Sequence, residues 1–254
     1  MDNKVIEIML ISLLSAHLVG DYIFQSEKMA KNKSKCKYLC MHAFLHALLT
    51  YLFLGCWENF TIPMVIFITH AIIDFIKAKI NKNTASFFLI DQLSHVLVIL
   101  LLSIFFQGDV NNFYWINLFE NRVLRIFIFI SGVILTLRTA SVLIGLILDN
   151  LLKISKKNKA EKIILPTERG IRKGGEIIGY LERALIFIFI LMNQPMAIGF
   201  LITAKSILRF GEIARQKSWV ESEYIIIGTF LSLLCGLIGG LMTRYLINNC
   251  CALV

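Results

Sequence analysis

The sequence predicts an all-α fold, a polytopic transmembrane bundle of about eight helices. Hydrophobic residues make up 57% of the 254 residues and the mean hydropathy is +0.73, whereas an ordinary globular domain is about 45–50% apolar. The apolar residues also come in runs close to the ~20 residues that one membrane crossing needs. The runs that we assign as spans are 5–25, 39–57, 61–80, 87–107, 122–149, 175–193, 195–211 and 223–247.

Charged or turn-forming segments separate these spans. The first span lacks the basic start and the small-residue cleavage site of a signal peptide, so we expect a retained helix. The lysine-rich segment 26–38 separates the first and second spans, and the basic segment 150–173 separates the fifth and sixth. Pro63 and Pro195 lie at the starts of the third and seventh spans, where proline is tolerated. The seventh span is the shortest.

Basic residues alternate between the connections and predict the orientation. They follow the first, third, fifth and seventh spans, whereas the connections around Asn59, 108–121 and Asn193 carry almost none. Because cytoplasmic loops carry the Lys/Arg excess, both termini are expected outside. The net charge of +9 is then explained by loops that face anionic lipid, and no nucleic-acid partner is needed.

All five histidines lie in the first 95 residues, each four residues from another candidate metal ligand. The pairs are His17 with Asp21, His42 with His46, His70 with Asp74, and Asp91 with His95. Residues four apart share one face of a helix, so each pair offers two ligands in one direction. At ~1.5 Å rise per residue, most of them lie roughly 6–15 Å from the cytoplasmic ends of their spans. Spans one to four are therefore expected to form one buried polar layer.

A divalent cation is the partner that satisfies several buried His and Asp side chains at once, since a carboxylate in hydrocarbon costs ~2.5–3.5 kcal/mol on insertion scales. Mixed imidazole and carboxylate ligands suit Zn, our first choice, or Mn, Fe or Ni. One or two ions are expected, because the candidates exceed the four ligands of one tetrahedral zinc. The alternative is polar packing between helices. The predicted ligands are His17, Asp21, His46, His70, Asp74, Asp91 and His95.

Other polar side chains are expected to hold the ligands in place or to contact a substrate. They are Gln25, His42, Gln92, Glu182, Arg183 and Lys205. His42 is expected near the lipid headgroups, where it could face water. Arg183 and Lys205 either reach the interface or pair with Glu182, or they hold an anionic group beside the metal.

The order of several motifs resembles a bacterial family of integral membrane proteins known only as a domain of unknown function. The motifs are His17-x3-Asp21-x3-Gln25, Met29-Ala30-x2-Lys33, Leu39-x2-His42, His70-x3-Asp74-x2-Lys77 and Asp91-Gln92-x2-His95. Residues 175–183 and 197–210 also look like longer members. The resemblance implies a bacterial inner-membrane protein with an N-terminal four-helix unit, residues 1–107, followed by C-terminal helices, residues 108–254, and it implies no reaction.

A looser similarity, in the use of His and Asp within apolar helices, points to membrane-bound metal-dependent hydrolases, although the chain lacks their His-Arg-Gly-x-Thr-His run. We therefore predict a hydrolase that acts on a lipid or lipid-linked phosphate from the cytoplasmic leaflet. Lys77 would neutralise negative charge, and Asp74 or Asp91 would take a proton. The alternatives are a divalent-cation or proton-coupled transporter and a membrane sensor or defence component with a structural metal. The expected partners are membrane lipids, and a homo-oligomer is compatible with the sequence.

Overall fold

The computed structural model describes residues 3–105, 112–158, 174–213 and 219–249, which form helices and turns and contain no strand. Both chain ends and residues 159–173 of the predicted basic segment 150–173 lie outside the described residues. The helices are α1 (Asn3–Val19), the π-helix η1 (Gly20–Phe24), α2 (Glu27–Lys31), α3 (Cys36–Leu54), α4 (Thr61–Ile80), α5 (Ala85–Phe105), α6 (Tyr114–Phe119), α7 (Asn121–Ile134), the π-helix η3 (Leu135–Thr139), α8 (Ala140–Asn158), α9 (Gly174–Leu191), α10 (Pro195–Ile213) and α11 (Trp219–Asn249).

Within the described residues, six helical stretches are long and apolar enough to cross a membrane. They are Asn3–Phe24, Cys36–Leu54, Thr61–Ile80, Ala85–Phe105, Asn121–Lys153 and Ser222–Asn249. These stretches coincide with the first five predicted spans and the eighth. The other two predicted spans fall on α9, which carries the charged side chains of Glu176, Glu182 and Arg183, and on α10, whose apolar part is shorter. The predicted all-α membrane bundle is confirmed.

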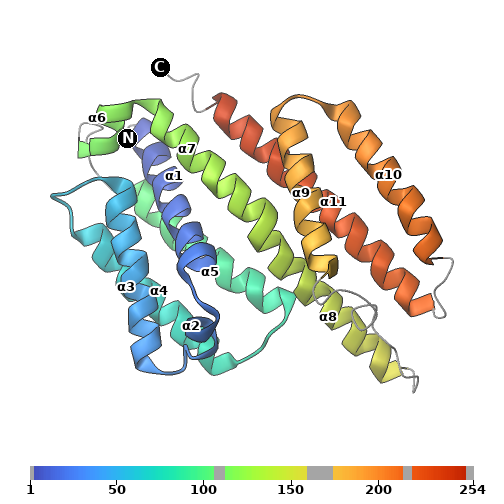
Figure 1. Cartoon of the computed structure of the whole chain (residues 1–254). Helices are drawn as coiled ribbons and strands as arrows, with labels where there is room; N and C mark the ends of the chain where they lie inside the picture. Colours follow the sequence, from blue (N-terminus) through green and yellow to red (C-terminus); the bar gives the residue numbers. More distant parts are fainter. Residues whose placement is uncertain (1–2, 106–111, 159–173, 214–218, 250–254) are drawn as a thin grey trace. The chain divides into compact units, whose positions relative to one another are not determined.

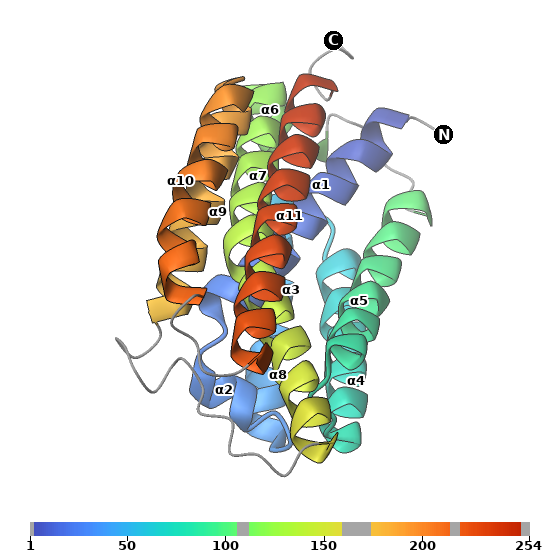
Figure 2. The same ribbon diagram turned by 90° about the vertical axis from the view of Figure 1, so that its right-hand side faces the viewer.

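The chain forms two compact units, one of residues 1–134 with 246–254 and one of residues 135–245. In the first unit α1 packs against α3, α5 and α7, and α4 packs against α3 and α5 (Figures 1 and 2). The hydroxyl of Ser15 on α1 lies 2.8 Å from that of Ser131 on α7. This unit is therefore larger than the predicted N-terminal segment 1–107, because α7 packs on α1.

The helices α4 and α5 are polar on the buried face and apolar on the exposed face. On α4 the buried residues Ile66, His70 and Asp74 follow one another at intervals of four, and the exposed residues Ile68 and Ile72 do the same two positions away. On α5 the buried residues are Asp91, His95, Ile99 and Ser103, and the exposed ones include Leu93, Leu97 and Leu101. An apolar surface around polar side chains is the arrangement that lipid favours.

Aromatic side chains gather where α3 ends and α6 begins. α3 ends at Gly55 in the left-handed conformation, with φ of 63°, and the Gly55 carbonyl accepts a hydrogen bond from the Tyr114 amide. Trp115 Nε1 donates to the Leu52 carbonyl at 2.6 Å. The rings in this group are those of Tyr51, Trp57, Phe60, Tyr114, Trp115 and Phe119. Such a group, here called the aromatic group, is typical of a membrane–water interface.

In the second unit α9 packs beside α10 (Figure 2), and isoleucines of α9 contact α11. A Cβ at Gly240 would lie 2.6 Å from Ile190 Cδ1, and one at Gly236 would lie 3.2 Å from Ile186 Cδ1. Small residues let membrane helices approach in this way. Ile186 and Ile190 form a core with Ile198 and Leu233.

Candidate metal centre

The site begins where α1 changes into the π-helix η1, which carries Asp21. The residue at the change is Gly20, and a Cβ there would lie 2.5 Å from Cε1 of His46. A Cβ at that distance would overlap the His46 ring. The ring can therefore lie where it does only because residue 20 is glycine. The glycine therefore sets the close approach between α1 and α3.

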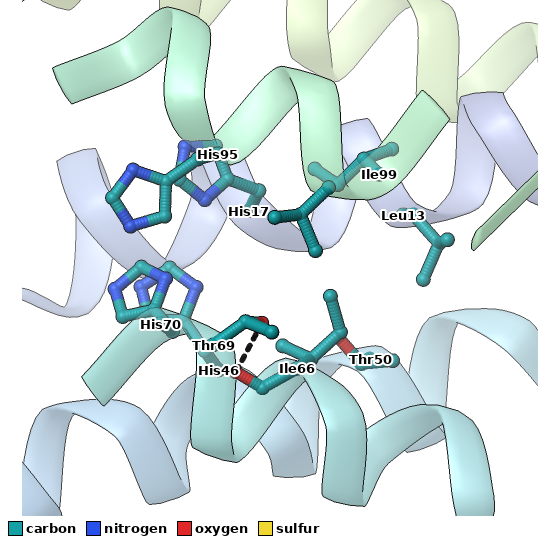
Figure 3. Close-up of a pocket in the computed structure, with 10 residues that line it drawn as sticks. Leu13, His17, His46, Thr50, Ile66, Thr69, His70, His95 and Ile99 are labelled. Carbon is teal, nitrogen blue, oxygen red and sulfur yellow. Dashed lines mark hydrogen bonds between the residues drawn. The ribbon is translucent and has the colours of Figure 1, made fainter. Parts of the chain in front are cut away.

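Imidazole rings from four helices meet in the first unit. Figure 3 shows His17, His46, His70 and His95 directed toward a small cavity from α1, α3, α4 and α5. The ring centres of His46 and His70 are 3.7 Å apart, those of His70 and His95 are 4.3 Å apart, and those of His17 and His95 are 5.0 Å apart. The ring centre of His42 lies 4.5 Å from that of His46. The imidazoles of four helices therefore form one cluster.

Four imidazole nitrogens in this cluster are buried without a hydrogen-bond partner among the described residues. They are the Nε2 atoms of His17, His46, His70 and His95. A buried polar atom without a partner costs about 1–3 kcal/mol, so four of them in one place point to a missing partner. Neutral imidazole nitrogens are common ligands of zinc and related ions. The donor set therefore fits a divalent metal ion.

The orientation of His95 supports this interpretation. Its Nδ1 lies 2.9 Å from the carbonyl oxygen of Asp91, and a carbonyl can only accept a hydrogen bond. The proton of neutral His95 is therefore on Nδ1, and the Nε2 lone pair is available in the cluster. Metal-binding histidines usually have the other ring nitrogen fixed by a carbonyl or carboxylate in this manner.

Two groups of side chains place their donor atoms within 4.8 Å of one another. The first consists of Asp21, His42, His46 and His70, and the second of His70, Asp74 and His95. Asp21 Oδ1 lies 3.2 Å from Nε2 of both His42 and His46, but only the His42 contact has hydrogen-bond geometry. Asp74 Oδ2 lies 3.5 Å from His70 Nε2. Either group could hold a metal ion.

The predicted ligands His17 and Asp91 are in neither group, although the structure places both beside the cluster. His17 Nε2 lies 3.6 Å from Asp21 Oδ2. Asp91 Oδ2 accepts a hydrogen bond from Lys77 Nζ at 2.5 Å, so this carboxylate forms an ion pair with the lysine. Lys77, predicted to neutralise negative charge, thus neutralises an aspartate of the protein.

Of the predicted accessory residues, His42 and Gln92 contact predicted ligands, and Gln25 contacts His42. Gln92 Nε2 donates to Asp21 Oδ2 at 3.1 Å, and Gln25 Nε2 lies 2.9 Å from His42 Nε2. The expectation that His42 could face water was wrong, because its side chain is fully buried. The inward face of α3 places it one turn from His46, among the ligands.

Sequence reasoning did not identify Lys33 as a residue of the site. Its Nζ lies 2.7 Å from Asp74 Oδ2, and the two side chains are only 12% and 2% exposed. Lys33 follows the short helix α2, which Ser26 caps by accepting a hydrogen bond from the Met29 amide at 3.2 Å. Met29 is buried. An apolar residue within a lysine-rich segment was the available signal that this segment turns back onto the bundle.

The residues Glu182, Arg183 and Lys205 form contacts within the second unit. Glu182 Oε2 accepts a hydrogen bond from Lys205 Nζ at 2.5 Å, so the predicted pairing with Glu182 holds for Lys205. Arg183 is only 3% exposed and donates to the carbonyls of Thr136 and Leu137 in η3. It also donates to the hydroxyls of Ser141 and Ser232. A contact of these residues with an anionic group stays a prediction.

Comparison with known proteins places this site in a family. Residues 9–124 match the model described as "Protein of unknown function (DUF3307)". We refer to the matched residues, 9–124, as the DUF3307 domain. The match confirms the resemblance to a family known only as a domain of unknown function, and the DUF3307 domain includes every candidate ligand from His17 to His95. No curated protein and no solved structure matches the chain, so the looser similarity to hydrolases stays a prediction.

Proposed function

We propose that the DUF3307 domain of this protein is a metal-dependent hydrolase in the bacterial inner membrane, acting on a lipid or lipid-linked phosphate at the cytoplasmic leaflet. The observation that carries the proposal is the convergence of four buried Nε2 atoms that have no hydrogen-bond partner among the described residues, those of His17, His46, His70 and His95. With adjacent carboxylates, this donor set suits zinc first and Mn, Fe or Ni next.

The reaction is hydrolysis of a phosphate ester. Water adds to phosphorus, the bond between phosphorus and the ester oxygen breaks, and the leaving oxygen takes up a proton. A divalent cation in the centre would supply Lewis acidity toward the phosphate and the attacking water. Asp74 or Asp91 would accept the proton of the water, and Lys77 would stabilise the negative charge that develops on the phosphate.

The charges at the edge of the cluster support an anionic substrate. Lys77 is 42% exposed, whereas its partner Asp91 is 4% exposed, so the ammonium connects the buried carboxylate to the surface. The basic connections predicted on the cytoplasmic side place this edge next to lipid headgroups. A phosphate in that layer would meet Lys77 before it reached the histidines.

Buried hydroxyl groups are the observation that favours a cation transporter as a second candidate. Thr50 and Thr69 line the same cavity as His46 and His70, and Ser103 lies two turns beyond His95 on the buried face of α5. Polar groups inside membrane helices often mark ion pathways. Uptake of zinc into proteoliposomes, without release of phosphate, would favour the transporter.

Elemental analysis of the full-length protein in detergent tests the metal centre. We expect a stoichiometric divalent metal in the wild type and its loss in His46→Ala and His70→Ala. The control is Ser103→Ala, since Ser103 bonds only the Ile99 carbonyl of its own helix and its removal should leave the metal in place. Release of inorganic phosphate from lipid phosphates should follow the metal content. A wild-type protein that retains no metal after mild washing would exclude this function.

A further inference from the structure

We infer that the DUF3307 centre binds one divalent cation, and that the ammonium group of Lys33 takes the place of a second one and binds the phosphate of the substrate. This inference rests on the proposed function and assigns the substrate-binding cation. Lys33 is not among the residues that the His and Asp pattern predicts.

One carboxylate oxygen connects Lys33 to the histidine cluster. Asp74 Oδ2 lies 2.7 Å from Lys33 Nζ, 3.5 Å from His70 Nε2 and 3.6 Å from His42 Nε2. The ammonium is therefore separated from two imidazole nitrogens of the cluster by a single oxygen atom. In a centre with two metal ions, a carboxylate that bridges the ions has the position that Asp74 has here between the histidine cluster and the Lys33 ammonium.

The two ligand groups differ in how completely they can hold an ion. Asp21, His42, His46 and His70 provide four donors, so three of them could hold a catalytic zinc and leave its fourth position open to water or substrate. The other group has only three members and shares His70 with the first. Its carboxylate, Asp74, already forms an ion pair with Lys33. A second divalent cation would have to compete with the lysine and would be repelled by it.

The position of Lys33 is set by the structure around it. Its side chain is 12% exposed, whereas Lys31 in the same segment is 76% exposed and pairs with Glu27 at the surface. Buried Met29 and the Ser26 cap hold α2 against the bundle, and the chain then turns so that Lys33 reaches Asp74. One lysine of this segment is thus directed inward while another is in solvent.

An ammonium at this position suits a phosphate ligand. It has three N–H donors, so it can donate to a phosphate oxygen while it remains beside Asp74. In two-metal centres the ions lie about 3.5–4 Å apart and bind both the attacking and the leaving oxygen. Lys33 would provide the second of these charges permanently, without a second metal.

The test compares the full-length wild type with Lys33→Ala and Lys31→Ala in detergent. Zinc per chain is measured at saturating zinc, and binding is measured for inorganic phosphate and for phosphatidylcholine vesicles with and without phosphatidate. We expect one zinc in the wild type and in Lys31→Ala. In Lys33→Ala we expect a second, weaker zinc and phosphate binding that is about tenfold weaker or more, as for the loss of a charged hydrogen bond.

Two results would overturn the inference. One is two zinc ions per wild-type chain, and the other is a Lys33→Ala protein unchanged in both zinc stoichiometry and phosphate affinity. Lys33→Arg keeps the charge and should bind one zinc, as the wild type does. This control shows whether an effect of Lys33→Ala comes from the lost charge or from misfolding. If Lys33→Ala binds both inorganic phosphate and the phosphatidate vesicles more weakly than the wild type, Lys33 recognises phosphate itself. If it binds only the phosphatidate vesicles more weakly, Lys33 recognises a lipid headgroup. A wild type without any zinc would instead contradict the proposed function.

Discussion

At the scale of single residues, the centre depends on what surrounds each imidazole as much as on the imidazoles themselves. Gly20 provides the space that the His46 ring occupies, and the Asp91 carbonyl fixes which nitrogen of His95 is protonated. Neither residue uses its own side chain for this. The ligand set therefore depends on backbone groups as well as on the side chains that would bind the metal.

Gly20→Ala should lower the zinc affinity by about 10–100-fold, the usual effect of disturbing groups that orient a ligand. The added Cβ would lie 2.5 Å from His46 Cε1, so the ring has to move away from its present position. The measurement is zinc competition with a chromophoric chelator. Gly145→Ala is the control, because a Cβ at Gly145 meets nothing within 4 Å. Equal zinc affinity in both variants would show that the contact with Gly20 is unimportant.

The spacing of His and Asp predicted which helix faces turn inward, but not the membership of the donor groups, because His17 and Asp91 are in neither group and His42 is in one. Residues four apart on a helix lie on one face, so the pattern alone identified the inward faces of spans one to four. Lys33 could not be predicted in the same way, because its position depends on the turn after α2 and not on helical periodicity. The motif Met29-Ala30-x2-Lys33 distinguished Lys33 from the other lysines of segment 26–38, but it gave no position for the side chain, which only the fold directs inward.

At the scale of the elements, α4 has two distinct faces. Its buried face carries the candidate ligands His70 and Asp74, and its exposed face carries Ile68 and Ile72, each about half exposed. The hydrophobic pattern predicted this helix with the bounds that the structure has, residues 61–80. It could not predict the π-helices η1 and η3, because one additional residue in a turn leaves the hydropathy of the segment unchanged.

Ile68→Asp should impair membrane insertion, since an acidic residue in the middle of a membrane helix costs about 2.5–3.5 kcal/mol on insertion scales. Ile68 is 50% exposed and lies on the face opposite to the ligands, so the cost arises from lipid contact. The amount of full-length protein in the membrane fraction measures the effect, and Ile68→Leu is the control. Normal recovery of Ile68→Asp would mean that this face of α4 does not contact lipid.

At the scale of the whole molecule, the candidate ligands are confined to the first unit, and a buried arginine forms the polar core of the second. The sequence predicted a division near residue 107 from the motifs of the N-terminal half. The compact unit extends to residue 134 because Ser15 contacts α7 through the Phe127 carbonyl and the Ser131 hydroxyl. A contact between residues more than a hundred positions apart has no local signal in the sequence.

Arg183→Met should destabilise the protein by about 1.5–3 kcal/mol, the usual value of a hydrogen bond to a charged group, without loss of zinc. The substitution removes the donors for the carbonyls of Thr136 and Leu137, whereas every candidate ligand lies in the first unit. Thermal unfolding in detergent and elemental analysis measure the two effects. Arg122→Met, at an exposed position, should change neither. Loss of zinc from Arg183→Met would show that the second unit is needed for the centre.

The aromatic group, whose rings come from α3, from the connection before α4 and from α6, has a consequence for how the domain would respond to its bilayer. Rings such as Trp57 and Trp115 favour the boundary between acyl chains and water, and the lysines Lys77 and Lys79 lie at the opposite end of α4. The 20 residues of α4 correspond to ~30 Å, the usual hydrocarbon thickness. With both ends anchored, a thinner bilayer would tilt these helices instead of letting them slide. The histidines would then keep their place between the two anchored ends of α4 while lipid composition changes.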